Sequence, residues 1–296
     1  MKKITPYLRL LRPANIVTSV ADVLAGMAIA GFFTGWIFNY DHLVPVFFIV
    51  AATIGLYGGG IVFNDVFDAA LDKVERPERP IPSGAVPLYR AVVLGSCFLA
   101  IGVLEGLLAS MVSGIIAFAI AAFALLYNKI SKHHAFWGPL NMGLCRGLNL
   151  LLGISIIPAM LQQWYLLALV PIAYIFSITM ISQGEVHGGN RNKLYIAAVL
   201  YLLVITALLY CSSRNGNMGF TFLFLLLFAF MIFNPLFLAI QNPVGKNIGK
   251  AVKAGVISLI LMDAAWAAGF NALYAALLIA CLLPLSRWLA KRFAVT

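Results

Sequence analysis

A run of polar residues, Asn-Asp-Val-Phe-Asp-Ala-Ala-Leu-Asp at positions 64–72, interrupts a strongly apolar chain. A stretch of apolar or small residues precedes it, so its acids lie at the mouth of a predicted membrane span. A carboxylate at membrane depth is costly and usually marks function. At about 100° per residue, Asn64, Asp65, Asp68 and Asp72 share one face of a helix. This face is the first candidate for chemistry.

The spacing of these residues predicts metal binding. Asn64 and Asp68 are one helical turn apart and can share a cation. Asp72 lies about 12 Å beyond Asn64 at a rise of ~1.5 Å per residue, too far to reach the same ion. The pattern therefore suits two hard divalent cations, and the usual substrate that bridges such ions is a phosphate chain.

The segment that follows, residues 73–86, contains three prolines and two arginines. Proline breaks a helix, so we predict an ordered, extended loop. Arg76 and Arg79 stand close to the acids, where an anion held by metals needs extra positive charge. A simpler alternative stays open here: the acids and arginines pair with each other at the membrane surface.

The composition is typical of a polytopic membrane protein. Of 296 residues, 62% are hydrophobic and 10% are charged, and mean hydropathy is +0.98. A soluble domain has about 25% charged residues. We therefore expect one integral-membrane domain over residues 1–296, with membrane lipid around it. The net charge of +10 does not indicate nucleic acid as a partner, because the basic residues sit mostly in short loops on one predicted side.

The expected fold is an all-α bundle, because backbone groups in lipid must be satisfied within helices. Hydropathy gives about nine spans of the length that a core of ~30 Å requires. The final stretch is too long for one span, and a division at Gly269–Asn271 would make ten. Nine is the first choice, with this stretch as one tilted helix or a span plus an amphipathic tail. The predicted spans are 16–37, 44–63, 89–108, 112–128, 139–158, 164–182, 194–211, 219–240 and 252–290.

Charge placement predicts the orientation. Fifteen of the 20 basic residues fall in the N-terminal segment and in every second loop. Under the positive-inside rule, the N-terminus and the loops that carry the motifs face the cytoplasm. We expect a multi-pass protein of the inner or cytoplasmic membrane.

Three segments resemble the UbiA superfamily of membrane prenyltransferases: the 64–72 motif, the Arg-Pro-Glu-Arg-Pro-Ile-Pro-Ser-Gly-Ala sequence after it, and Leu-Arg-Pro-Ala-Asn at 11–15. The resemblance implies a nine-helix bundle around a central cavity. It also implies that Mg²⁺ ions hold an isoprenyl diphosphate between two Asp-rich motifs while an acceptor attacks its allylic carbon. Asn64, Asp68 and Asp72 would be metal ligands, and Asp65 a ligand or a support for one.

The second motif departs from the family pattern of Asp-x-x-x-Asp. Glu185 stands for the first acid, but Gly189 takes the second position, with His187 and Asn190 as weaker substitutes. One carboxylate fewer predicts weaker binding of a second Mg²⁺. The Glu-Val-His-Gly-Gly run is similar to the UbiA-like branch called EboC. A hydrogen-bonded loop at a helix end is the alternative interpretation of Glu185 and His187.

Between the motifs, Tyr127, Lys132, Asn141 and Arg146 are candidate substrate-binding residues. Family members often use Lys or Arg in this region to grip the diphosphate, so the resemblance implies that role for Lys132 and Arg146. The alternatives are a membrane-surface anchor for Lys132 and a buried pair with Glu105 or Asp263 for Arg146, because an arginine inside the membrane needs a partner.

Two residues near the N-terminus and a glycine run leave further expectations. Asp22, with Asn15 before it, lines the cavity mouth or makes a helix-packing hydrogen bond. The Gly58-Gly59-Gly60 run permits close approach of another helix.

The predicted function is Mg²⁺-dependent transfer of an isoprenyl group from its diphosphate to a hydrophobic acceptor, aromatic or lipid. Asp68 and Asp72 would hold metal, and Lys132, Arg79 and Arg146 would stabilise the leaving group. The alternative is a protein with the same bundle that binds or moves a lipophilic precursor without prenylating it. Gly189 is the feature that favours it.

Overall fold

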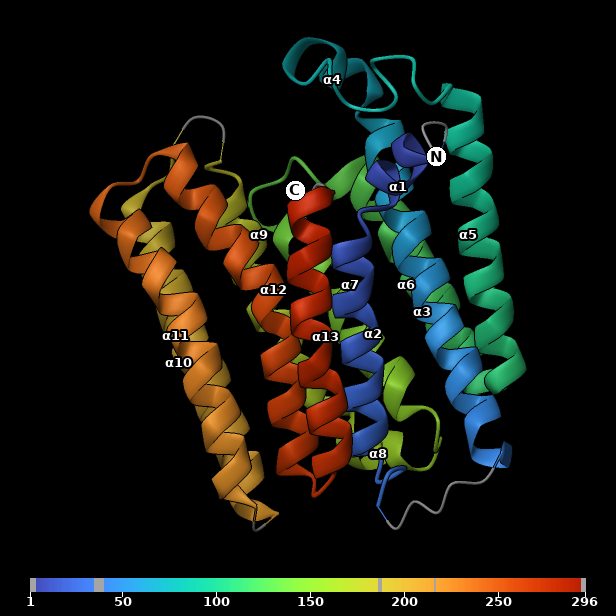
Figure 1. The fold of residues 1–296 in the computed structure, drawn as a ribbon, viewed down its shortest axis with the longest axis vertical. Helices are drawn as coiled ribbons and strands as arrows, with labels where there is room; N and C mark the ends of the chain where they lie inside the picture. Colours follow the sequence, from blue (N-terminus) through green and yellow to red (C-terminus); the bar gives the residue numbers. More distant parts are fainter. Residues whose placement is uncertain (1–3, 35–39, 186–187, 216, 294–296) are drawn as a thin grey trace.

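The described part of a computed structural model, residues 4–34, 40–185, 188–215 and 217–293, is helical throughout and contains no strand (Figure 1). This confirms the predicted all-α fold. The helices in chain order are α1 (Thr5–Leu11), α2 (Pro13–Ile29), α3 (Tyr40–Phe67), α4 (Ala69–Glu75), α5 (Leu88–Ala109), α6 (Met111–Leu126), a π-helix η1 (Tyr127–Ser131), α7 (Trp137–Ile154), α8 (Met160–Trp164), a 3-10 helix η2 (Tyr165–Ala168), α9 (Leu169–Ser182), α10 (Arg191–Arg214), α11 (Met218–Gln241), α12 (Gly245–Gly269) and α13 (Leu273–Arg292).

The bundle has a clear centre. Within the described residues, eight helices are long and apolar enough to cross a membrane. Helix α12 has 83% of its most apolar window buried, whereas the other seven have 22–44%. Near its end, four alanines and a glycine surround Trp266 in Asp-Ala-Ala-Trp-Ala-Ala-Gly, and these small residues let α2, α11 and α13 pack closely around the helix. The other long helices keep one apolar face outward.

Helix α2 is shorter than the predicted span 16–37. It ends at Ile29, and Ala30–Thr34 form turns. It is nevertheless almost wholly buried, because it packs against α7, α12 and α13. A Cβ at Gly26 would lie 2.8 Å from the Cα of Gly153, so the backbones of α2 and α7 touch at a point where only glycine fits. This contact brings the polar residues of α7 next to α2.

The glycine run on α3 serves helix packing, as predicted. A Cβ at Gly58 would lie 2.8 Å from Phe98, and one at Gly59 would lie 2.7 Å from Leu99, both on α5. Gly60 has more room, and its carbonyl oxygen accepts a hydrogen bond instead. Helices α3 and α5 therefore form a tight pair that fixes the end of α3 where the polar motif begins.

The last apolar stretch consists of two helices, as in the alternative division at Gly269–Asn271, so the first-choice expectation of one tilted helix or a span plus a tail at 252–290 is wrong. Helix α12 ends at Gly269, and Asn271 adopts a left-handed backbone (φ 63°) before α13 begins at Leu273. Asparagine tolerates this conformation better than most residues. With the extra helix, the two ends of the described chain lie at the same end of the bundle, near α1 and α4 (Figure 1).

The motif segment continues α3 across a small irregularity at Asp68. Helical hydrogen bonds persist, from Asp68 N to Asn64 O (3.1 Å) and from Asp72 N to Asp68 O (2.8 Å). The loop after α4 is ordered but not extended, which corrects the prediction. It folds into turns, with Val86 N donating to Pro80 O (2.9 Å). These turns place Arg79 back over the acids.

Candidate active site

A cavity of about 350 Å³ opens at the end of the bundle that carries the 64–72 motif. This volume is within the range of small-molecule sites. Its mouth is polar and charged, its walls are apolar, and its inner end is polar again. The mouth is lined by Arg12, Asn64, Asp68, Arg76, Arg79, Asn128, Lys132 and Glu185, and the walls include Leu56, Ile61, Ile120, Ala124, Ile175, Ile178, Val252 and Val256.

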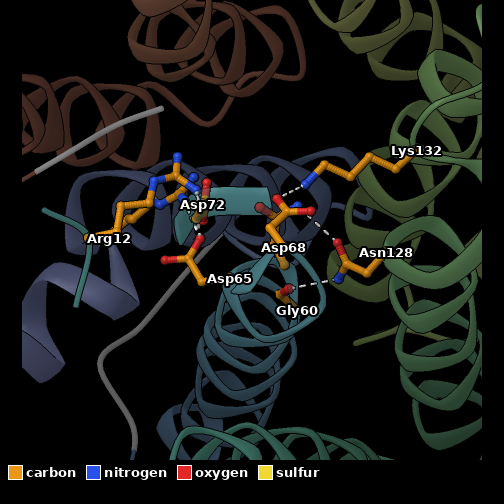
Figure 2. Close-up of polar contacts among 9 residues, drawn as sticks. Arg12, Gly60, Asp65, Asp68, Asp72, Asn128 and Lys132 are labelled. Carbon is orange, nitrogen blue, oxygen red and sulfur yellow. Dashed lines mark hydrogen bonds and ion pairs between the residues drawn. The ribbon is translucent and has the colours of Figure 1, made fainter. Parts of the chain in front are cut away.

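The four motif residues, predicted to share one face, divide between two environments, and Figure 2 shows Asp68 beside Lys132 and Asp65 beside Arg12. Asn64 and Asp68 line the cavity, where Asp68 pairs with Lys132. Asp65 and Asp72 do not line it and turn toward arginines instead. The arc of about 100° is wide enough for one edge to face the cavity and the other to face the arginines.

Arginines bind the second pair of acids. Arg12 Nη2 donates to Asp65 Oδ1 (2.6 Å), and Arg79 Nη1 lies 2.8 Å from Asp72 Oδ2 and 3.5 Å from Asp65 Oδ1. The pairing of acids and arginines that the sequence left open therefore exists for Asp65 and Asp72. Arg79 also lines the cavity, so Asp65 and Asp72 hold it at the mouth.

Arg12 is a cavity residue for which the sequence suggested no role. It separates α1 from α2 in a left-handed conformation (φ 45°), which is rare outside glycine. Burial lowers the pKa of its guanidinium, and the nearby Asp65 carboxylate raises it. The sequence feature that could have indicated Arg12 is its position in Leu-Arg-Pro-Ala-Asn, where the proline ends one helix and starts the next.

The π-helix η1 and the residue that follows it supply two more groups to the mouth, Asn128 and Lys132. Asn128 was missed from the sequence. Its amide nitrogen donates to Gly60 O (3.0 Å), and its oxygen accepts from Asn64 Nδ2 (3.0 Å). Burial lowers the pKa of the Lys132 ammonium, and Asp68 raises it through their hydrogen bond. Single π-turns recur at functional sites because they re-aim side chains.

Two other candidates from this region lie differently. Tyr127 is buried and lines the cavity. Asn141 is buried too, but it does not line the cavity; its amide lies 2.9 Å from the Ser131 hydroxyl. Asn141 therefore fastens α7 to η1 and helps to position Asn128 and Lys132.

The second motif contributes one described residue to the cavity. Glu185 lines the mouth, and its Oε1 has no hydrogen-bond partner among the described residues. Burial raises the pKa of this carboxyl group, while Arg76 and Arg12 oppose the rise. His187 lies outside the described residues. Asn190 caps α10 by accepting from Asn192 N (2.8 Å), and it is exposed.

Gly189 is also absent from the cavity lining. Its N–H donates to Pro243 O (3.0 Å), and a Cβ there would lie 2.6 Å from Ile248. Because Gly189 does not line the cavity, the absence of an acid at this position leaves no empty space at the mouth.

Arg146 lies at the inner end of the cavity and pairs with Asp22 of α2, with Nε 2.5 Å from Asp22 Oδ2. The alternative named Glu105 or Asp263 as the partner of Arg146; the ion pair is with Asp22 instead, and Asp263 lies close to that pair. Asp22 is buried and accepts from Asn149 Nδ2 (3.0 Å), so it makes the helix-packing bond that was one of its two predicted roles.

Comparison with known proteins decides the family. The model of the UbiA prenyltransferase family matches residues 19–248, which is most of the chain. The chain belongs to this UbiA family. It is accordingly a prenyltransferase and an integral, multi-pass membrane protein, and the predicted resemblance is confirmed at family level.

Named relatives of this UbiA-family chain include two digeranylgeranylglyceryl phosphate synthases. The one from Methanosphaera stadtmanae is 25% identical over 89% of this chain and 98% of its own length. The one from Saccharolobus solfataricus is 25% identical over 77% of this chain and 83% of its own length.

Solved structures share the fold. A structure concerning digeranylgeranylglyceryl phosphate synthase matches with a TM-score of 0.66 at 21% identity, covering 91% of this chain and 99% of that one. A UbiA homologue from Archaeoglobus fulgidus bound to DMAPP and Mg²⁺ matches with a TM-score of 0.65 at 15% identity, covering 90% and 99%. At these identities the likeness concerns the fold.

The side-chain oxygen atoms at the cavity mouth of this UbiA-family protein fit a magnesium ion that is bound partly by the protein and partly by a substrate. Among the described residues, no three His, Cys, Asp or Glu side chains are grouped so that they could hold a metal ion by themselves. However, Mg²⁺ commonly takes one or two carboxylates and completes its shell with water and phosphate oxygens. Asn64 and Asp68 face the cavity one turn apart, and Glu185, whose Oε1 has no hydrogen-bond partner among the described residues, lines the same space.

Proposed function

We propose that this protein transfers an isoprenyl group from an allylic diphosphate, bound at the cavity mouth with Mg²⁺, to a lipid-soluble acceptor in the membrane. One observation carries the proposal: a single cavity joins a mouth lined with cations and carboxylates to apolar walls. An isoprenyl diphosphate is divided in the same way, into a charged diphosphate head and an apolar hydrocarbon tail. By the positive-inside rule, the mouth faces the cytoplasm.

The positively charged side chains at the mouth can bind the diphosphate. Arg12, Arg76, Arg79 and Lys132 all line it. Arg76 makes no ion pair with any described residue, so its charge is available to an incoming anion at once. Arg12, Arg79 and Lys132 are held by acids until the substrate arrives. Charge-assisted bonds from such groups are the strong ones in diphosphate recognition.

Asn64, Asp68 and Glu185 are the residues that would hold Mg²⁺. When bound, the ion stabilises negative charge on the departing diphosphate. Lys132 must then leave Asp68 and can turn to the phosphate oxygens. Asp65 and Asp72 act in this account through Arg12 and Arg79. The donor proposal is supported by the DMAPP and Mg²⁺ in the Archaeoglobus fulgidus homologue.

In the reaction, the bond between the allylic carbon and the diphosphate oxygen breaks, and its electron pair leaves with the diphosphate. The acceptor forms the new bond to that carbon and releases a proton. The apolar walls keep water from the allylic cation. The names of the relatives favour a glyceryl phosphate lipid as the acceptor, ahead of an aromatic compound. The assignment to the EboC branch stays a prediction from the Glu185–Gly189 run.

Release of pyrophosphate tests the proposal. Purified protein with geranylgeranyl diphosphate, Mg²⁺ and geranylgeranylglyceryl phosphate or a hydrophobic phenol should release pyrophosphate. Asp68→Asn should reduce the rate of pyrophosphate release by 100-fold or more, because the variant loses the metal ion that stabilises negative charge on the departing diphosphate. Glu75→Gln, an exposed acid of α4, is the matched control and should keep full activity. Donor binding without turnover in the wild type would instead indicate a carrier.

A further inference from the structure

The inner end of the cavity is polar although it lies deep in the bundle. It is lined by Thr53, Tyr57, Arg146 and Asn149. Along α3, Thr53 is twelve residues before Asp65, which corresponds to ~18 Å at the helical rise. This polar group is therefore separate from the diphosphate site at the mouth, and apolar residues of the walls lie between the two.

Two nitrogens of Arg146, Nε and Nη1, make no hydrogen bond with the described residues at this inner end. Its side chain is only 3% exposed. Nη2 donates to Thr18 O (2.8 Å), Nε lies against Asp22, and the guanidinium carbon lies 5.5 Å from the centre of the Tyr57 ring. Nη1 has no hydrogen-bond partner among the described residues. A buried donor without a partner is rare and costly, which points to a ligand or water in the cavity.

The charge of Arg146 is already balanced. Asp22 forms an ion pair with its Nε, and Asp263 is buried close to this pair. No donor among the described residues reaches the Asp263 oxygens. Because Asp22 already pairs with Arg146, the described residues that line the inner end offer no unpaired cation to a further full negative charge.

We propose that the inner end of the cavity binds an uncharged oxygen of the acceptor, a hydroxyl or a carbonyl, through Arg146 Nη1. The proposal rests on the proposed function, because it names where that reaction's second substrate is recognised. Asp22 fixes the guanidinium, and Asn149 supports Asp22. Asn149 is itself held by Thr53, whose hydroxyl donates to Asn149 Oδ1 (2.6 Å).

A hydrocarbon tail does not suit this position. An isoprenyl chain placed against Arg146 would leave Nη1 desolvated and without an acceptor. The donor's tail is therefore expected along the apolar walls. Selection of an oxygen by a buried donor is strong because the analogue that lacks the oxygen leaves the donor unpaired.

Binding of three small probes tests the inference without requiring turnover. Geraniol carries a hydroxyl, geranic acid carries a carboxylate at neutral pH, and the corresponding hydrocarbon carries neither. Each is titrated by calorimetry into the purified protein with Mg²⁺ and saturating pyrophosphate, which fills the mouth. The variants are Arg146→Lys, which keeps the charge opposite Asp22 but loses the planar fork, and Met142→Leu, a volume-conserving control that lines the cavity from the same helix.

We expect the wild-type protein to bind geraniol about 10-fold or more tightly than the hydrocarbon, as one hydrogen bond to a charged donor predicts. The preference should disappear in Arg146→Lys and remain in Met142→Leu, and geranic acid should bind no more tightly than geraniol. Equal binding of geraniol and hydrocarbon by the wild type overturns the inference, whether or not the variant folds. A preference that persists in Arg146→Lys, or tightest binding of geranic acid, overturns it too.

The outcome can be told apart from a failure of the proposed function. Pyrophosphate release from geranylgeranyl diphosphate depends on the mouth, whereas the probe titration depends on the inner end. A protein that binds geraniol selectively but releases no pyrophosphate refutes prenyl transfer and keeps the subsite as a binding site. Turnover without selectivity refutes the subsite alone.

Discussion

Removal of Lys132 should have opposite effects on metal binding and on turnover. Lys132 pairs with Asp68 at the cavity mouth, and the two side chains are 20% and 12% exposed. Because the lysine occupies the carboxylate that we assign to Mg²⁺, the ion must displace it. In Lys132→Met this competitor is gone, while a positive charge for the diphosphate is also gone.

The expected changes in Mg²⁺ affinity and in kcat follow from the strength of the Lys132–Asp68 charge pair, which is mostly buried. A hydrogen bond between charged groups contributes about 1.5–3 kcal/mol net. We take the lower end for the competition with metal, so Mg²⁺ without donor should bind Lys132→Met about 10-fold more tightly. Loss of the contact to the departing diphosphate should lower kcat by about 10- to 100-fold.

Calorimetric titration with Mg²⁺ measures the first effect, and pyrophosphate release under saturating donor measures the second. Lys129→Met is the control, because Lys129 is an exposed residue of the π-helix η1, which ends directly before Lys132. It should change neither quantity. Weaker metal binding in Lys132→Met, or unchanged turnover, would refute the assignment of Asp68 and Lys132 to one shared site.

Three further changes separate the roles of neighbouring residues. Asp72→Asn should raise the donor KM about 10-fold with a smaller change in kcat, because Asp72 holds Arg79 and does not line the cavity; a loss as complete as that of Asp68→Asn would make Asp72 a metal ligand instead. Arg12→Met should raise the donor KM and lower the free energy of unfolding by about 1–3 kcal/mol, because it leaves the buried Asp65 with a weaker partner; unaltered thermal unfolding would speak against this. Gly189→Asp should leave the Mg²⁺ dependence of pyrophosphate release unchanged, since this position is outside the cavity lining; a tighter dependence would return the second motif to the metal site.

The helical class and the location of the site were predictable because they depend on local pattern. Continuous apolar runs require helices in lipid, and the polar residues at 64–72 interrupt such a run. The division of the final stretch was harder to predict. Its hydropathy is compatible with one long tilted helix, so the division at Gly269–Asn271 stood only as the alternative, and the break depends on Asn271 in a left-handed conformation.

The partners of the charged residues were not predictable, because they come from distant parts of the chain. Arg12 meets Asp65 across 53 positions, and Arg146 meets Thr18 across 128. Asn128 gave no signal either, since it is aimed by a π-helix that local sequence does not indicate. Helical spacing placed the motif acids on one face, but only Arg12 and Arg79 determine which of them turn from the cavity.

The position of the metal tests the account most directly. Crystals of the protein with Mn²⁺ in place of Mg²⁺, soaked with a non-hydrolysable isoprenyl diphosphate, would give an anomalous difference map. We predict a peak within coordination distance of Asp68 and Asn64, with Lys132 turned from Asp68 to the diphosphate. A peak elsewhere in the bundle, or a bound diphosphate with the Lys132–Asp68 pair intact, would contradict the account.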